Sequence, residues 1–330
     1  MYRFPKAAQK IDGGGLSMKK ILFTGGGSAG HVVPNIALIE AVRDEADVCY
    51  MGTDGPEKGL IVPLKIPYWE ISCPKFIRSF SFRNLKIPAE FLRAEKKATE
   101  GLKAFRPDVV FSKANRLMAK KCRYLLTSFP ETADKFKNGK YCGSPLRKQL
   151  FEGRRAEALK KYGLPAGRKT LLVFGGGSGS RAINDALRKN VSRLCKKYNV
   201  LHLCGKGNAV ESNIPHYVQK EFETDMASAY AAADLVVSRA GSNTIFEILA
   251  LKKPAILIPL EGQTRGDQAQ NAAYFQQKHL CRVLKQSEAD FLPEAIEDAL
   301  TDTELISALA VSDFSSGNAN ILHEIRRFLV

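Results

Sequence analysis

Two glycine-rich loops, one in each half of the chain, constrain the fold more than any other feature. Residues 25–31 (GGGSAGH) follow the apolar run 21–23, and residues 175–181 (GGGSGSR) follow the apolar run 171–174. A strand that turns through glycines into a helix directs free backbone N–H groups toward an anion, and the helix dipole strengthens that attraction. Two such units predict two Rossmann-like domains facing a common cleft, with a phosphate-bearing substrate between them.

The order of the remaining segments predicts an α/β protein built on parallel sheets. Runs of strand length alternate with helical stretches, and the expected strands are 20–24, 48–51, 108–111, 124–127, 170–174, 199–204, 235–238 and 255–259. This alternation implies parallel strands covered by helices. The expected division is a disordered extension at 1–17, a Rossmann-like domain at 18–145, a second one at 146–312, and a C-terminal helix within 313–330 that packs back on the first domain.

The composition of the chain limits the classes of molecule that it is expected to bind. The chain has 330 residues, enough for two domains, and its net charge of +16 favours nucleic acid, an anionic membrane surface or a phosphorylated substrate. A basic solvated surface is the alternative reading. Because no nucleic-acid-binding motif is present, we expect no nucleic-acid partner. Seven scattered cysteines predict reduced thiols in a cytoplasmic protein, and no spacing of His or Cys predicts a metal site.

One segment mixes basic and bulky apolar residues. Residues 74–88 (PKFIRSFSFRNLKIP) suit the interface of an anionic bilayer, where apolar groups insert and cations meet the head groups. A loop and helix that pack their phenylalanines into the domain would explain the same pattern equally well. No segment approaches the ~18 apolar residues of a membrane span.

The first glycine loop carries two further signals. Gly25, Gly27 and Gly30 match the dinucleotide-binding fingerprint, with Asp54 in the place of the ribose-binding acid, but a dehydrogenase would not need the second loop. His31 follows at the start of a helix, where the dipole disfavours the cationic imidazole. A neutral imidazole there predicts a general base, with helix capping as the alternative.

Polar residues also follow two strands of the second half. Residues 239–247 (RAGSNTIFE) turn from a buried strand into a helix, again a position that can meet phosphate. Glu247, one turn into that helix, could accept hydrogen bonds from sugar hydroxyls or simply favour the helix dipole. Gln268 and Asn271 share one face of a later helix, and such neutral amides suit a polyhydroxylated ligand.

Four stretches in this order resemble the MurG family of GT-B glycosyltransferases: residues 26–34, residues 52–53 with Glu57, residues 180–184, and residues 225–271. This family transfers N-acetylglucosamine (GlcNAc) from UDP-GlcNAc to lipid I (undecaprenyl-pyrophosphoryl-MurNAc-pentapeptide), giving lipid II for peptidoglycan synthesis. The likeness covers nearly all of residues 18–330 and implies the GT-B fold, with two Rossmann-like parallel-sheet domains facing across a cleft.

The resemblance implies a role for each matching residue. In the first domain, Ser28, Ala29 and Gly30 would face the donor diphosphate or the acceptor pyrophosphate, with His31 near the acceptor hydroxyl as the catalytic residue. Arg147 would contact the donor phosphates. In the second domain, the donor diphosphate would be bound by Gly177, Ser178, Ser242, Asn243 and Thr244. Glu223 would hold the uracil through backbone contacts, and Glu247 would hold the ribose. Gln268 and Asn271 would bind the GlcNAc hydroxyls.

The implied reaction is an inverting displacement that needs neither a metal nor a cofactor. The acceptor sugar hydroxyl attacks the anomeric carbon while helix-terminal N–H groups stabilise the departing UDP. The implied partners are UDP-GlcNAc, lipid I and an anionic membrane surface, with the protein bound peripherally at the cytoplasmic face of the bacterial cell membrane.

The chain departs from the family pattern twice. Gly177 occupies the place of a serine in the second loop, with Ser178 one position later. After Lys113 the chain runs directly into Ala114, so that about one βα unit of ~30 residues is missing. Only about a dozen residues then separate the strands expected at 108–111 and 124–127, close to the minimum for a crossover. We expect weakened stability or altered acceptor binding.

Three alternatives stay open at this point. A related GT-B enzyme would use another acceptor, such as diacylglycerol, or would epimerise UDP-GlcNAc without an acceptor. A non-catalytic remnant would bind a nucleotide sugar or a membrane and transfer nothing. Hydride transfer with a nicotinamide cofactor ranks last.

Overall fold

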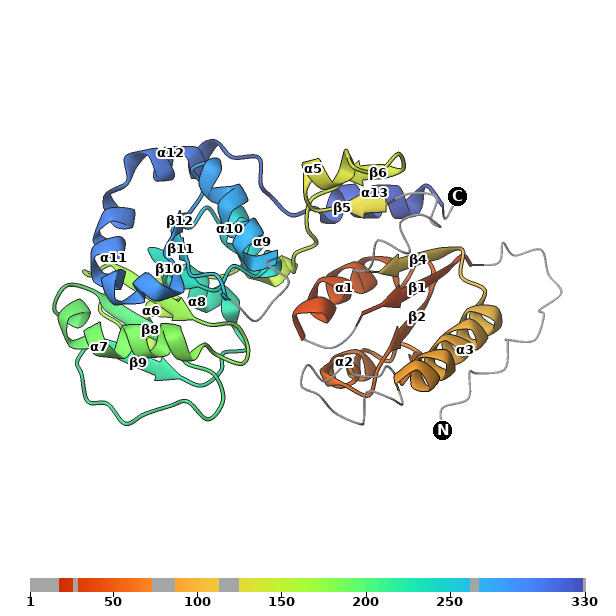
Figure 1. Ribbon diagram of the computed structural model, residues 1–330, viewed down its shortest axis with the longest axis horizontal. Helices are drawn as coiled ribbons and strands as arrows, with labels where there is room; N and C mark the ends of the chain where they lie inside the picture. Colours follow the sequence, from red (N-terminus) through yellow and green to blue (C-terminus); the bar gives the residue numbers. More distant parts are fainter. Residues whose placement is uncertain (1–17, 26–28, 73–86, 113–124, 262–266, 329–330) are drawn as a thin grey trace. The chain divides into compact units, whose positions relative to one another are not determined.

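The computed structural model describes the chain except for residues 1–17, 26–28, 73–86, 113–124, 262–266 and 329–330 (Figure 1). Two compact units make it up: unit 1 comprises Met1–Arg147 and Gly317–Val330, and unit 2 comprises Lys148–Ser316. Both are built on parallel strands, which confirms the predicted α/β class. Among the described residues, no helix combines the length and the apolar character needed to cross a membrane.

Unit 2 has one continuous six-stranded parallel sheet in the order β12-β11-β10-β7-β8-β9. Its strands are β7 (Thr170–Phe174), β8 (Asn199–Leu203), β9 (Tyr217–Lys220), β10 (Leu235–Ser238), β11 (Ala255–Leu257) and β12 (Arg282–Val283). Every residue of β7, β8 and β10 is buried. Central parallel strands require this because helices cover both of their faces.

Helices surround this sheet. They are α6 (Arg155–Tyr162), α7 (Arg181–Lys197), α8 (Met226–Ala232), α9 (Ser242–Ala250), α10 (Asp267–Gln277), α11 (Leu292–Thr301) and α12 (Thr303–Val311), with the 3₁₀ turns η3 (Lys148–Phe151) and η4 (Gln286–Phe291). In α7, Ile183, Leu187, Val191 and Leu194 recur every three or four residues and are buried against the sheet. This spacing gives the helix one apolar face.

Unit 1 contains two separate sheets. The larger one has the order β3-β2-β1-β4, from β1 (Lys20–Thr24), β2 (Asp47–Gly52), β3 (Tyr68–Glu70) and β4 (Val109–Ser112); the smaller pairs β5 (Leu125–Thr127) with β6 (Gly139–Tyr141). The helices of unit 1 are α1 (Ala29–Val42), α2 (Pro56–Ile61), α3 (Ile87–Phe105), α5 (Pro130–Ala133) and α13 (Asn318–Arg326), with the 3₁₀ turn η1 (Val62–Leu64).

Helix α13 packs within unit 1. Ile321 and Ile325 are buried in the same apolar cluster as Leu38 and Val42 of α1. Figure 1 shows α13 beside the small sheet, and an ion pair of 2.7 Å joins Glu324 of α13 to Lys140 of β6. The C-terminal residues therefore complete the core of the unit that begins the chain.

The two sheets of unit 1 separate where the sequence departs from the family pattern. The strand expected at 124–127 forms as β5, but among the described residues it pairs only with β6 and not with β4. Strand β4 is therefore an edge strand of the larger sheet, and Val110 is 41% exposed. The βα unit expected to be missing after Lys113 falls between β4 and β5 in the sequence.

Candidate functional site

The residues predicted to bind the donor in unit 2 follow the carboxyl ends of its strands. Strands β7 and β10 are neighbours, with Phe174 opposite Ser238, and each is the last strand residue before one of the predicted phosphate-binding turns. The chain leaves β7 toward β8 on one side of the sheet, whereas β10 and β11 lie on the other side. In open α/β sheets, ligands bind where the strand order reverses in this way.

The glycine loop after β7 is shaped by close backbone packing. Gly179 has a φ of +77°, and a Cβ there would lie 2.2 Å from the carbonyl oxygen of Cys204. Gly175 is equally restricted, because a Cβ would lie 2.3 Å from the backbone nitrogen of Ser180. Gly177 is different: no atom lies within 4 Å of a Cβ built there, so a serine side chain fits without a clash. Gly177 and Ser178 are both exposed.

A buried polar network supports the backbone on which Gly179 packs. Asn184 donates from its amide nitrogen to the Cys204 carbonyl (2.9 Å), so its amide oxygen faces His202 Nε2 at 3.0 Å. His202 Nε2 must therefore carry the proton, and Nδ1 accepts from the hydroxyl of Tyr217 at 2.8 Å. Burial and the charge of Arg188 lower the pKa of His202 to about 4. His202 is thus a neutral structural residue.

Helix α9 begins directly after the turn that follows β10. Gly241 at its N-cap has no side chain to cap the helix, and Ser242, Asn243 and Thr244 form the half-buried first turn. One turn later, the carboxylate of Glu247 accepts a hydrogen bond of 2.9 Å from the hydroxyl of Tyr230, which is fully buried on α8. Tyr230 thus orients Glu247, and no motif in the sequence marks this tyrosine.

The two predicted amides of α10 hold neighbouring loops. Gln268 accepts from the backbone N–H of Leu260 at 3.0 Å, and Asn271 donates to the carbonyl of Ala240 at 3.3 Å. Within the described residues, these bonds use only the oxygen of Gln268 and only the nitrogen of Asn271. The amide N–H groups of Gln268 and the amide oxygen of Asn271 are not used by these bonds.

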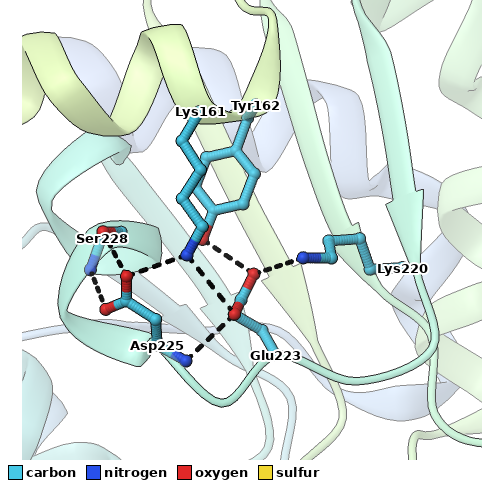
Figure 2. Close-up of polar contacts among 6 residues, drawn as sticks. All are labelled: Lys161, Tyr162, Lys220, Glu223, Asp225 and Ser228. Atoms are coloured by element: carbon cyan, nitrogen blue, oxygen red, sulfur yellow. Dashed lines mark hydrogen bonds and ion pairs between the residues drawn. The ribbon is translucent and has the colours of Figure 1, made fainter.

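Glu223 lies in the loop after β9, and its side chain faces the protein interior (Figure 2). Its carboxylate accepts hydrogen bonds from the hydroxyl of Tyr162 (3.0 Å), Nζ of Lys220 (2.6 Å) and the backbone N–H of Asp225 (3.0 Å). Burial alone would raise the pKa of Glu223, but these hydrogen bonds outweigh it and lower the pKa below its ordinary value. The carboxylate is therefore a buried, satisfied anion.

The predicted residues of unit 1 are only partly described. Ser28 lies outside the described residues; Ala29, Gly30 and His31 form the first turn of α1, and only their backbone is described. Arg147 is half-buried at the end of the first segment of unit 1. Leu146, the residue before Arg147, is held by the side chain of Asn318, which accepts from its backbone N–H at 2.9 Å and donates to its carbonyl at 2.6 Å.

In the turn after β2, Glu57 holds the backbone in place. Glu57 is fully buried and accepts from the backbone N–H of Thr53 at 2.9 Å and from the hydroxyl of the same residue. Asp54, which the dinucleotide fingerprint would place on a ribose, has a side chain that is 74% exposed and pairs with Lys58. The basic segment 74–88 lies outside the described residues, except for the backbone of its last two residues.

Two family models match the chain. The glycosyltransferase family 28 N-terminal domain matches residues 21–121, and the glycosyltransferase family 28 C-terminal domain matches residues 170–320. Among solved structures, Acinetobacter baumannii MurG is similar with a TM-score of 0.67 and 19% identity over 94% of this chain and 99% of that one. The calicheamicin glycosyltransferase CalG4 has a TM-score of 0.66 and 17% identity, over 95% and 99%. The fold is therefore GT-B.

Relatives with closer sequences carry one name, UDP-N-acetylglucosamine–N-acetylmuramyl-(pentapeptide) pyrophosphoryl-undecaprenol N-acetylglucosamine transferase. The Clostridium perfringens (strain SM101) protein is 36% identical, over 93% of this chain and 98% of its own length. The Clostridium botulinum (strain Loch Maree / Type A3) protein is 37% identical, over 83% of this chain and 88% of its own length.

The alignment also measures what this chain lacks. It spans 349 positions with the Clostridium perfringens protein, whereas 93% of this 330-residue chain is about 307 residues. About 42 positions therefore have no counterpart in this chain, a number large enough for the βα unit of ~30 residues expected to be missing after Lys113. The chain therefore belongs to glycosyltransferase family 28, together with these relatives.

Proposed function

We propose that this chain transfers GlcNAc from UDP-GlcNAc to lipid I, giving lipid II. One observation supports this most directly. The glycine loop before α7 and the turn before α9 leave neighbouring strands at the point where the strand order of unit 2 reverses. Two helix N-termini placed in this way attract a diphosphate. The oriented carboxylate of Glu247 and the amides of Gln268 and Asn271 follow the same edge and suit sugar hydroxyls.

The proposed reaction is a single inverting displacement. The acceptor sugar hydroxyl forms a bond to the anomeric carbon of GlcNAc as the bond from that carbon to the diphosphate breaks. His31 accepts the hydroxyl proton, since a neutral imidazole is favoured in the first turn of α1. Backbone N–H groups at the starts of α7 and α9 stabilise the charge that develops on the departing UDP.

The acceptor also sets where the protein would act. Lipid I lies in the bilayer, and we propose peripheral binding to the anionic cytoplasmic face of the bacterial cell membrane. The net charge of +16 and the basic segment 74–88 support this part of the proposal. Binding to anionic vesicles that weakens as salt is raised would test it, with neutral vesicles as the control.

The decisive experiment measures transfer of labelled GlcNAc to a short-chain lipid I analogue. It compares the chain as it stands with a version carrying the βα unit of the Clostridium perfringens relative after Lys113. Transfer by both proteins supports the proposal. Transfer by neither, while UDP-GlcNAc is converted without an acceptor or GlcNAc is passed to diacylglycerol, would replace the proposal by an epimerase or by another lipid acceptor.

A second function is favoured by the divided sheet of unit 1. If the missing strand carries acceptor contacts, this chain binds UDP-GlcNAc through unit 2 and transfers nothing. Calorimetric binding of UDP-GlcNAc by the chain, with transfer only in the version that has the restored unit, would identify such a donor-binding remnant. Transfer by the chain as it stands would exclude it.

A further inference from the structure

The loop after β9, residues 221–225, is held by a cluster of charged and aromatic side chains that surround the buried carboxylate of Glu223. Resting on the proposed function, we propose that Tyr162, Lys220 and Glu223 are positioning residues that set recognition of the donor's nucleobase. None of these side chains touches the base in this proposal. They act by holding the backbone that does.

The loop presents backbone groups suited to reading a base. Among the described residues, the N–H and C=O groups of residues 222–224 make no hydrogen bond within the protein. This segment follows β9, on the same sheet edge as the glycine loop, because Lys220 and Glu221 pair with the backbone of Cys204 and Gly205. A pyrimidine that presents one donor beside one acceptor can be read by a single N–H and C=O pair, provided that their positions are fixed.

The cluster fixes those positions from three directions (Figure 2). Tyr162 reaches Glu223 from the end of α6, Lys220 from the end of β9, and the N–H of Asp225 from the start of α8. Lys161 bridges Asp225 at 2.8 Å and Glu223 at 3.5 Å. The loop therefore cannot move without breaking bonds to a buried carboxylate.

The environment of Tyr162 makes the cluster stiff. Its ring has the ammonium groups of Lys161 and Lys220 at 5.2 and 5.5 Å from its centroid, within range of cation–π attraction. The side chain of Glu223 is only 4% exposed. A buried carboxylate is tolerated only while its partners remain in place, so removing one partner disturbs the whole loop.

Two variants test this inference without deleting the cluster. Tyr162→Phe removes one hydroxyl and keeps the ring, and Glu223→Gln keeps the shape and removes the charge. The matched control is Glu297→Gln, which breaks an exposed ion pair with Lys197 on another face of unit 2. The measurements are the dissociation constants of UDP and CDP, competition by inorganic pyrophosphate, and the melting temperature.

Both variants should weaken UDP binding about tenfold and narrow the preference for UDP over CDP, with competition by pyrophosphate unchanged. The control should match the wild-type protein in UDP and CDP binding and in competition by pyrophosphate. Variants that keep the wild-type UDP-to-CDP ratio while melting earlier would overturn the inference, because the cluster would then serve stability alone. If the wild-type protein binds no UDP, the proposed function fails, and this inference falls with it.

Discussion

Both units are built on parallel strands covered by helices, but only unit 2 joins all of its strands in one sheet. In unit 2, every residue of β7, β8 and β10 is buried in one continuous six-stranded sheet. In unit 1, β4 is an edge strand with Val110 exposed, and the residues of β5 are only half-buried in a separate pair of strands. The exposure of β4 and β5 is what the expected loss of a βα unit between them predicts, because strands of a parallel sheet depend on their neighbours for cover.

The largest expected effect is on kcat, from a change at the proposed base in unit 1, whereas a change at the proposed donor site in unit 2 should affect KM. We expect His31→Ala to lower kcat about 10²- to 10⁴-fold, the usual contribution of a general base, with the affinity for UDP unchanged. Glu247→Gln should instead raise KM for UDP-GlcNAc, because its carboxylate is proposed to hold the ribose. Steady-state kinetics and calorimetry measure both. If both variants changed kcat and KM to the same extent, His31 and Glu247 would not have the separate roles in catalysis and donor binding proposed for them.

Next in size is the stability of unit 1. A restored strand between β4 and β5 would cover several apolar side chains, each contributing about 1.5–3 kcal/mol, so we expect a gain of about 3 kcal/mol or more. In the chain as it stands, unit 1 should unfold at lower urea than unit 2, with faster amide exchange in β4 and β5 than in β7 and β10. Simultaneous unfolding of both units would show that the divided sheet costs little.

Within unit 2, two glycines of one loop should differ. Gly179→Ala should cost about 2 kcal/mol and impair donor binding, because the left-handed backbone and the Cys204 carbonyl leave no room for a Cβ. Gly177→Ser, which introduces the serine of the family pattern into open space, should change stability by less than about 0.5 kcal/mol. Urea unfolding measures both, and equal costs would contradict the packing described for this loop.

A pH dependence should distinguish unit 2 through His202. Its pKa is lowered to about 4, so the unfolded chain binds this proton more readily, and stability falls as the pH drops from about 6.5 toward 4. The expected loss between pH 7 and pH 5 is about 2 kcal/mol. His202→Gln should reduce that slope in urea titrations of unit 2. An unchanged slope would assign the acid sensitivity to other groups.

The smallest effect concerns the outer face of unit 2. Lys189, Arg193 and Lys197 of α7 pair with Asp290, Glu294 and Glu297 in an exposed row of ion pairs. Removing one pair by Glu297→Gln should change the stability of unit 2 little, and any loss should fall further at high salt. A larger, salt-independent loss would mean that this row contributes to the core of the unit.

The sequence predicted more of unit 2 than of unit 1 for a physical reason. Strands 170–174 and 235–238 and the turns after them depend on continuous apolar runs and on local glycines, signals that act within a few residues. In unit 1 the same kind of signal predicted strand β5, but it could not predict which strand pairs with β5, because pairing depends on segments that are distant in sequence. Between β4 and β5 the sequence has 12 residues, whereas a βα unit needs about 30.

Sequence patterns alone predicted the α/β class and the glycine turn after β7, because strand length, helix starts and tight turns are local properties. Only the tertiary structure decided how side chains far apart in sequence are used. Glu223 faces Tyr162, 61 positions away, and His202 is held neutral between Asn184 and Tyr217. These contacts join residues that the sheet places together although they are far apart in sequence, so no local pattern could reveal them.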